Sequence, residues 1–424
     1  MREMKDSGVE WIGEIPSDWE LTKIGSVYDE RNTKVSDEDY PPLSVTKQGV
    51  VPQLETAAKT DNGDNRKLIC KNDFVINSRS DRRGSCGISE YEGSCSLINT
   101  VLMPQRHMCN RYYGYVFKSD LFADEYYRWG HGIVDDLWST KWSDMKNIYI
   151  PMPKLDEQEH RADYLDSKCS KIDEIIAKQE QVIEKLKEYK LSVITEAVTK
   201  GLESDLGVKD SGDSEIGLIP KNSVVMKLKY LCNTQGRIGF KGYTTADLVD
   251  EGEGAITLGA SHMNNGVIDL TNPVYISWEK YYESPEIMVN QGDILIVQRG
   301  STIGKTAIVD KDYGKVTINP SLVLMNKIRI NNKYLLYALS ARYIVNQIEL
   351  IGTNTAIPMI SQKQINELKV VVPPKEEQDR IKEYLDSICR DIDYKILKFE
   401  TLILKLQAYK KSLIYEVVTG KKEV

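Results

Sequence analysis

The sequence predicts an α+β protein in which two β-rich domains alternate with two long helices that pack against each other. Three observations support this fold class. A run of nearly fifty residues occurs twice without a gap at an offset of 220, from Pro153 and from Pro373, with about half of its positions identical. A shorter repeat opens each half, DSGVEWIGEIP at 6–16 and DSGDSEIGLIP at 210–220. Short β-branched runs fill the stretches between, so the chain has a pseudo-twofold internal repeat.

The first β-rich domain is expected over residues 1–150. Short apolar runs such as DFVINS (73–78) are separated there by Gly, Asn and Asp turns, and the helical stretch YYGYVFKSDLFADEYYRWG follows them. The second is expected over residues 206–372, where the strand GDILIVQR (292–299) precedes the helical stretch KYLLYALSARYIVNQIELIG. A polar Gly/Ser/Asp linker at 201–214 separates the halves.

The helical spacers are expected over residues 151–205 and 373–424. Apolar side chains there follow alternating spacings of four and three over more than four heptads, which is the signature of a coiled coil. The exposed faces are strongly charged, so each apolar seam needs a partner, and the other copy is the nearest one. Gln179, Lys190 and Lys410 interrupt the seam, and polar seam residues can fix its register. The predicted seam comprises Leu165, Ile172, Ile176, Ile183, Leu186, Leu385, Ile392, Ile396, Ile403 and Leu406.

An alternative for the two helices is that each packs separately on its own domain. The gapless repetition of the seam favours mutual packing instead. The length of 424 residues exceeds what a single core supports, which agrees with several domains. Seven scattered cysteines without a CxxC pair, a polar N-terminus and no apolar run of about 18 residues indicate free thiols, no membrane span and a cytoplasmic protein.

The net charge of −7 argues mildly against nucleic acid as a partner, but the charge is uneven. Residues 1–150 carry 19 basic and 24 acidic side chains, whereas residues 221–370 carry 16 and 13. Local patches would therefore have to hold a nucleic acid, and the total charge leaves the question open.

The most tempting catalytic motif is GSTIGKT at 300–306, which follows an apolar strand. A phosphate-binding P-loop needs four residues between its glycines, and here three separate Gly300 from Gly304. The first half carries a counterpart, SRSDRRGSCGIS, in which Arg79 corresponds to Arg299. A strand followed by Arg, small polar residues and Gly suits contact with guanine or phosphate, or else it is a solvated basic turn.

Other catalytic signatures are missing from the sequence. NPVY at 272–275 lacks the second proline of the box that amino-methyltransferases of nucleic acid use, and no glycine-rich cofactor loop accompanies it. The four histidines have no metal-ligand spacing, and no carboxylate cluster has the lysine that a nuclease needs. We therefore expect no catalytic residue, no metal site and no cofactor on this chain.

Several of these motifs together resemble the specificity subunit of type I restriction–modification systems. They are GVEWIGEIPSDWE (8–20), GDILIVQRGSTIGK (292–305) and the paired PKLDEQEHRADYLD (153–166) and PPKEEQDRIKEYLD (373–386). The resemblance covers the whole chain. The second half departs from the pattern at its opening, with Asn222, Ser223 and Val224 where a Trp usually follows the proline.

The resemblance implies a non-catalytic subunit that binds double-stranded DNA. Each β-rich domain would be a target recognition domain for one half of a bipartite, asymmetric site, and the two helices would form an antiparallel coiled coil. Two methyltransferase subunits, which carry S-adenosylmethionine, and restriction/translocase subunits would dock on it. The alternative is a protein-interaction scaffold with two peptide-binding domains. From the loop patterns we predict DNA contacts at Lys47, Gln48, Arg79, Arg82, Arg83, Lys241, Arg299, Ser301, Thr302 and Lys305.

Overall fold

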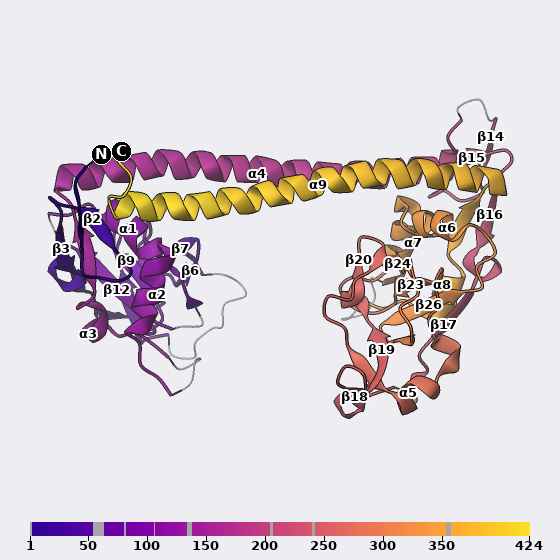
Figure 1. The fold of residues 1–424 in the computed structure, drawn as a ribbon, viewed down its shortest axis with the longest axis horizontal. Helices are drawn as coiled ribbons and strands as arrows, with labels where there is room; N and C mark the ends of the chain where they lie inside the picture. Colours follow the sequence, from indigo (N-terminus) through magenta and orange to yellow (C-terminus); the bar gives the residue numbers. More distant parts are fainter. Residues whose placement is uncertain are drawn as a thin grey trace. The chain divides into compact units, whose positions relative to one another are not determined.

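The computed structural model forms two compact units, each of which combines a β-rich domain with ends of both long helices (Figure 1). Unit 1 is Met1–Glu180 with Glu400–Val424, and unit 2 is Gln181–Phe399. The predicted α+β class with an internal repeat is confirmed. The structure describes residues 2–53, 63–79, 82–105, 107–133, 138–203, 207–239, 242–352 and 358–424.

The main sheet of unit 1 is antiparallel, with strand order β10-β9-β12-β4. Successive side chains of a strand point to opposite faces. On β9, Phe74 and Ile76 therefore pack with the aromatic helices, whereas Val75 packs on the smaller sheets. The strands are β1 (Met4–Asp6), β2 (Glu14–Pro16), β3 (Glu20–Lys23), β4 (Tyr28–Glu30), β5 (Lys34–Val35), β6 (Leu43–Thr46), β7 (Gly49–Pro52), β8 (Arg66–Ile69), β9 (Phe74–Asn77), β10 (Cys86–Ile88), β11 (Gly93–Cys95), β12 (Asn99–Pro104) and β13 (Tyr149–Met152).

Unit 2 repeats this layout around a sheet of order β17-β26-β23-β24-β21-β20. On β23, Ile294 and Ile296 face the helices while Leu295 and Val297 face a second apolar cluster. The strands are β14 (Val208–Asp210), β15 (Leu218–Pro220), β16 (Val224–Lys227), β17 (Asn233–Gly236), β18 (Leu248–Val249), β19 (Gly254–Leu258), β20 (Met263–Asn264), β21 (Val267–Ile268), β22 (Tyr275–Ser277), β23 (Ile294–Val297), β24 (Thr306–Ile308), β25 (Val316–Ile318), β26 (Leu322–Asn326) and β27 (Lys369–Val372).

Helices follow the main sheet in both units, as the sequence predicts. Ser119 caps α2 and Asn331 caps α6, because each side chain accepts an N–H of the first helical turn. The helices are α1 (Asn110–Lys118), α2 (Asp120–Arg128), α3 (Trp142–Met145), α4 (Leu155–Lys200), α5 (Trp278–Tyr282), α6 (Asn332–Leu339), α7 (Arg342–Gly352), α8 (Gln362–Asn366) and α9 (Lys375–Val418).

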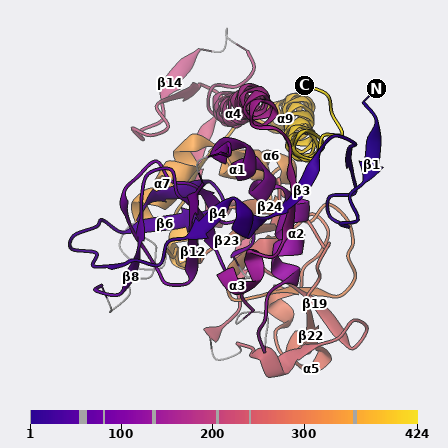
Figure 2. The same cartoon turned by 90° about the vertical axis from the view of Figure 1, so that its left-hand side faces the viewer.

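The long helices α4 and α9 lie side by side (Figure 2). Their ion pairs join Lys410 to Asp173 in unit 1 and Lys190 to Asp393 in unit 2, so the two helices run antiparallel within each unit. In unit 1 the Nζ of Lys410 lies 2.6 and 2.7 Å from the two carboxylate oxygens of Asp173. In unit 2 the Nζ of Lys190 lies 2.7 Å from both carboxylate oxygens of Asp393. The repeat offset of 220 exchanges the two pairs. The lysines that interrupt the apolar seam therefore have acidic partners on the opposite helix, and the same contact occurs in both units.

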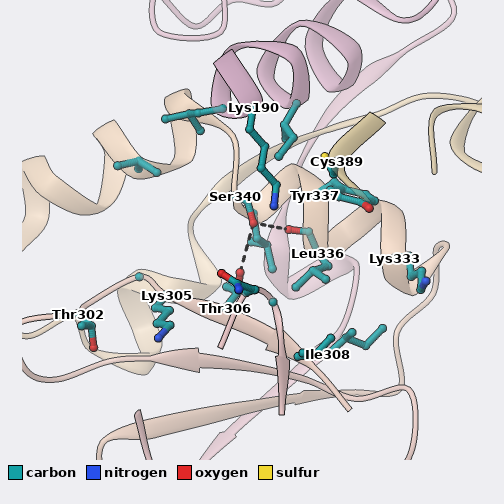
Figure 3. Close-up of a pocket in the computed structure, with 18 of the residues that line it drawn as sticks. Lys190, Thr302, Lys305, Thr306, Ile308, Lys333, Leu336, Tyr337, Ser340 and Cys389 are labelled. Carbon is teal, nitrogen blue, oxygen red and sulfur yellow. Dashed lines mark hydrogen bonds between the residues drawn. The ribbon is translucent and has the colours of Figure 1, made fainter. Parts of the chain in front are cut away.

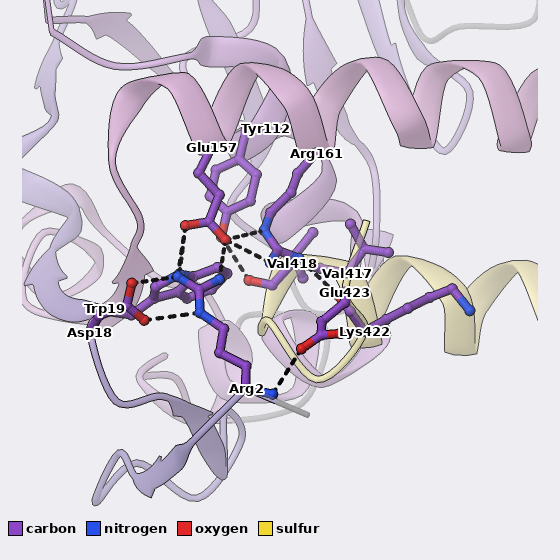
Figure 4. A network of polar contacts seen from close by, with 10 residues as sticks. All are labelled: Arg2, Asp18, Trp19, Tyr112, Glu157, Arg161, Val417, Val418, Lys422 and Glu423. Atoms are coloured by element: carbon purple, nitrogen blue, oxygen red, sulfur yellow. Dashed lines mark hydrogen bonds and ion pairs between the residues drawn. The ribbon is translucent and has the colours of Figure 1, made fainter.

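The C-terminal end of α9 belongs to the core of unit 1, where Trp19 and Arg161 hold it (Figure 4). The indole N–H of Trp19 donates to Glu157 at 3.0 Å, and the Arg161 guanidinium lies 4.7 Å from the centre of the Trp19 ring. Arg161 is only 2% exposed and donates to the carbonyl oxygens of Val417 and Lys422 at 2.9 and 3.0 Å. A buried guanidinium needs such partners, because an unpaired buried charge is strongly destabilising.

Unit 2 lacks this arrangement. Offsets of 204 and 220 place Ser223 and Ile381 where unit 1 has Trp19 and Arg161, and Ser223 and Ile381 are both buried. Unit 2 therefore has neither partner of the contact between the Trp19 ring and the Arg161 guanidinium. Glu377, the counterpart of Glu157, accepts the backbone N–H of Leu202 just beyond the end of α4.

Candidate nucleic-acid interface

Arg79 and Arg299 begin equivalent loops that leave the central strand of each main sheet. The Arg79 backbone bridges to Ser139, and the Arg299 backbone bridges to Met359. Both partners are also related by the offset of 220, so the sheet extends into the same second segment in each unit. The Arg299 side chain is exposed and the Arg79 side chain is half-buried. The predicted equivalence of the two loops therefore holds in three dimensions.

The loop after Arg299 is a closed turn rather than a phosphate cradle. The backbone N–H groups of Gly300, Ile303, Gly304 and Lys305 all donate to carbonyl oxygens of the protein, at 2.9–3.2 Å. Gly300 and Gly304 have φ values of 114° and 82°, which favour glycine. A P-loop must point such N–H groups at the bound phosphates. This geometry gives a structural reason to exclude a P-loop at GSTIGKT.

The side chains of this loop lie at the rim of a cavity of about 900 Å³ in unit 2 (Figure 3). Ser301, Thr302 and Lys305 line it together with Lys190 and Arg390 of the long helices. Ser301 and Thr302 are exposed, and Lys305 is half-buried. The structure thus brings three of the predicted contact residues of unit 2 to one place, while Arg299 does not line this cavity.

Ion pairs neutralise some of the cations around the cavity. Lys190 pairs with Asp393, and Lys333 lies 3.4 Å from Asp386. Within the part of the chain that the structure describes, Lys305 has no ion pair. An unpaired ammonium beside exposed hydroxyls is a suitable contact for a phosphate oxygen, because phosphate accepts hydrogen bonds from both kinds of donor.

Lys47 and Gln48 form the exposed tip of the β6–β7 hairpin in unit 1. The Gln48 N–H donates to the Thr46 hydroxyl oxygen at 3.2 Å, which tightens the turn. A side-chain carbon added at Gly87 of β10 would lie 2.9 Å from the Cα of Gly49, so the hairpin rests closely on the main sheet. Gln48 also lines a cavity of about 490 Å³. The tip is therefore exposed but firmly supported.

Unit 2 has a matching hairpin, which is not among the contact segments predicted from the sequence. Asn264 and Asn265 are exposed at the tip of β20–β21, where Asn265 has a φ of 47° and Gly266 a φ of 79°. The carbonyl of Gly266 accepts the N–H of Ile308 on β24 at 2.9 Å. Asn-Gly between two short apolar runs is a strong hairpin signal and could have located it. The β6–β7 hairpin contacts β10, and β21 pairs with β24, which is the counterpart of β10, so both hairpins lie beside equivalent strands.

The remaining predicted contacts of unit 1 behave differently from one another. Arg82 and Arg83 are both exposed. Arg83 forms an ion pair with Asp124 and lies 5.7 Å from the centre of the Tyr127 ring, so its guanidinium is already engaged. Lys241, predicted as a contact of the second domain, lies outside the described residues.

The predicted seam residues all lie on covered faces of α4 and α9. The Oε1 atom of Gln179, a polar interruption of the seam, is buried and finds no hydrogen-bond partner among the described residues. The buried seam residues are Leu165, Ile172, Ile183, Leu385 and Ile392, and the half-buried ones are Ile176, Leu186, Ile396, Ile403 and Leu406.

Neither a metal site nor a membrane span emerges from the described part of the chain. Among these residues, no group of three or more His, Cys, Asp or Glu side chains could hold a metal ion. No helix among them is long and apolar enough to cross a membrane. Burial raises the pKa of the Cys86 and Cys232 thiols to about 12, so these thiols stay protonated and unreactive.

Comparisons with known proteins find similar sequences among type I restriction enzyme specificity subunits. The family model described as type I restriction modification DNA specificity domain matches residues 220–401. The putative type I restriction enzyme MjaX specificity subunit of Methanocaldococcus jannaschii is 26% identical, over 97% of this chain and 95% of that protein. The type I restriction enzyme MjaVIII specificity subunit of the same organism is 25% identical, over 96% and 93%.

A solved structure agrees in fold. It comes from a study of complex assembly and conformational transition of the type I R-M system, and it matches with a TM-score of 0.71 at 15% identity. The match covers 96% of this chain and 99% of that chain. The resemblance that the sequence motifs indicate is therefore confirmed, and the chain is similar to type I restriction enzyme specificity subunits over nearly its whole length.

Proposed function

We propose that this protein is the sequence-specific DNA-binding subunit of a type I restriction–modification complex and recognises a bipartite, asymmetric DNA site. The observation that carries the proposal is the internal repeat. Two units of one layout carry different exposed loops at equivalent places, beginning at Arg79 and at Arg299. Two similar supports with different contact residues suit a site whose two halves differ in sequence.

The proposal assigns a role to each segment of the chain. Residues 1–150 and 206–372 are the target recognition domains 1 and 2, and residues 151–205 and 373–424 are the spacers that set the distance between the half-sites. Two methyltransferase subunits also bind to the spacers, and restriction/translocase subunits then bind to this complex. The catalytic groups and the S-adenosylmethionine belong to those partners, while this chain supplies recognition alone.

The charges of the loops support contact with DNA despite the acidic total. Lys305 with its neighbouring hydroxyls suits phosphate, whereas Arg299 has the bidentate donors that guanine accepts. The exposed amides of Gln48 and Asn265 suit adenine, which offers one donor and one acceptor in the major groove. Arg83 is a weaker candidate because it is already paired with Asp124.

Exchange of one recognition domain tests the two-reader proposal. Residues 1–150 are replaced by the corresponding segment of a relative, and methylated adenines are mapped genome-wide with the methyltransferase subunits present. The expected result is a new sequence in one half of the site and an unchanged other half. A change in both halves would refute the proposal.

A point substitution tests the contact at Arg299. Arg299→Ala should weaken binding by about 1–3 kcal/mol on the cognate duplex alone if the guanidinium contacts guanine. If it contacts only phosphate, binding should fall on all duplexes and the slope of log affinity against log salt should drop by about one. Lys311→Ala, which removes a charge from another turn of unit 2, is the control. Duplex binding without any salt dependence in the wild type would favour the peptide-binding scaffold instead.

A further inference from the structure

Helices α1 and α6, which follow the main sheet of each recognition domain, begin with the same short motif. α1 begins Asn-Arg-Tyr-Tyr-Gly-Tyr at 110–115, and α6 begins Asn-Lys-Tyr-Leu-Leu-Tyr at 332–337. The shared pattern is Asn, a cation, Tyr, two variable residues and Tyr. The loops of the two domains differ, so the common motif suggests a task that both domains share. The contacts of this motif with the spacer helices indicate what that task is.

The second tyrosine of the motif binds an aspartate of the spacer helix. The Tyr115 hydroxyl donates to Asp166 at 2.7 Å, and the Tyr337 hydroxyl donates to Asp386 at 2.8 Å. The offset of 220 relates the two aspartates, and each ends the Tyr-Leu-Asp stretch of the long repeat. The cation of the motif adds to this contact, since Arg111 lies 2.5 Å from Asp166. Lys333 lies 3.4 Å from Asp386 in the same way.

A glutamine at the start of each spacer helix holds the beginning of the same motif. The Gln158 side chain accepts the Cys109 N–H at 2.9 Å, just before α1. The Gln378 side chain accepts the Asn331 N–H at 3.0 Å, just before α6. Both glutamines are buried. The glutamine and the aspartate lie about two helical turns apart along each spacer helix, so their two contacts define the direction of α1 in unit 1 and of α6 in unit 2.

The first tyrosine of the motif reaches the end of the other long helix. The Tyr112 hydroxyl donates to the carbonyl of Val418 at 2.7 Å. The Tyr334 hydroxyl donates to the carbonyl of Val371 on β27 at 2.8 Å and also lies 3.4 Å from the carbonyl of Val198. Both tyrosines are fully buried, so they belong to the packed core. Tyr115 and Tyr337 are half-buried at the edge of the contact, where the loss of a hydroxyl leaves the ring packing in place.

We propose that Tyr115 and Tyr337 are positioning residues, whose hydrogen bonds to Asp166 and Asp386 set the angle of each recognition domain on its spacer helix and so select the gap between the two half-sites. This inference rests on the proposed function. One base pair corresponds to about 3.4 Å and roughly a tenth of a helical turn of DNA. A recognition domain that is held firmly binds much more weakly to a site whose gap is wrong by one base pair. A loosened domain loses less affinity on such a site.

The test uses Tyr115→Phe and Tyr337→Phe in the full chain, assembled with its methyltransferase subunits. Tyr113→Phe is the matched control, because the Tyr113 hydroxyl on the same helix is buried and finds no hydrogen-bond partner among the described residues. Unit 2 has Leu335 at that position. Binding is titrated on duplexes with the native gap and with one base pair added or removed, and thermal unfolding is recorded for each variant.

The ratio of affinities for the native and altered gaps should fall roughly tenfold in Tyr115→Phe and in Tyr337→Phe, which corresponds to the loss of one hydrogen bond to a charged group. Tyr113→Phe should keep the wild-type ratio. An unchanged ratio in both test variants overturns the inference, and so does an equal loss of affinity on every duplex, which indicates a merely structural role. Since the two joints are equivalent, either variant carries the test if the other does not fold.

The failure of this inference is separable from failure of the proposed function. Wild-type protein that does not discriminate cognate from scrambled duplexes contradicts the proposed function itself. Wild-type discrimination of sequence and gap, combined with unchanged gap selection in both tyrosine variants, contradicts only the role of Tyr115 and Tyr337.

Discussion

Two equivalent aspartates in the two units differ in their hydrogen-bond partners: one is paired with an arginine and the other is not. This difference leads to a prediction about stability. Asp73 accepts two hydrogen bonds from Arg31, at 2.7 and 3.0 Å. Asp293, its counterpart, is 8% exposed and accepts the Asn290 N–H at 2.8 Å, but Gln235 takes the place of the arginine. Burial raises the pKa of Asp293 to about 6, and its hydrogen bonds with Asn290 only partly oppose this.

The sign of the effect follows from the raised pKa. The folded state binds the Asp293 proton more tightly than the unfolded state, so ionised Asp293 destabilises the fold above pH 6. This destabilisation of the folded state decreases as the pH falls from 6 to 4, and it is absent below pH 4. A shift of about two pKa units corresponds to roughly 3 kcal/mol. Asp293→Asn resembles the protonated acid, so it should raise the melting temperature of unit 2 by about 5–10 °C at pH 7.5 and leave it unchanged near pH 4.

Thermal unfolding of the full chain at several pH values measures this difference, because each variant is compared with the wild type at the same pH. Asp73→Asn is the matched control and should destabilise unit 1 at pH 7.5, since it weakens the contact with Arg31. Gln235→Arg should supply the missing partner and remove most of the effect of Asp293→Asn. A destabilised Asp293→Asn at pH 7.5, or a stability difference that does not change with pH, would show that Asp293 is not buried in its charged form.

Three further predictions concern the helices. One heptad inserted after Leu186 and after Leu406 lengthens each helix by roughly 10 Å, which should widen the gap between the two half-sites by about three base pairs or abolish binding. Mapping of methylated adenines measures the gap, and an unchanged gap at full affinity would mean that the helices do not set it. A double-mutant cycle on Lys190 and Asp393 should yield a coupling of about 0.5–1 kcal/mol, because both side chains are partly exposed, and zero coupling in urea unfolding contradicts the contact. Arg161→Met should destabilise unit 1 by about 3 kcal/mol, because it removes the buried guanidinium that donates to the carbonyl oxygens of Val417 and Lys422; Arg380→Met, at an exposed arginine, should change stability by less than about 0.5 kcal/mol, and equal effects would refute this reasoning.

The sequence by itself determined the repeat, the two long helices and the central strands. Heptad spacing is a local property, so the seam from Leu165 to Leu186 could be read without knowledge of its partner. The apolar runs of β9 and β23 are equally local. The equivalence of Arg79 and Arg299 followed from the constant offset between the copies. The predicted contact residues remain predictions, and the structure places Ser301, Thr302 and Lys305 together at one cavity.

Tertiary structure alone decided which polar groups meet. The lysines at 190 and 410 were visible as interruptions of the seam, but their partners Asp393 and Asp173 lie about two hundred residues away in the sequence. The tyrosine–aspartate joints and the hairpin that presents Asn265 also depend on distant segments. The physical reason is that periodicity reports which face of an element is covered, whereas a hydrogen bond or an ion pair requires two specific atoms within about 3 Å, and only the folded chain brings them together.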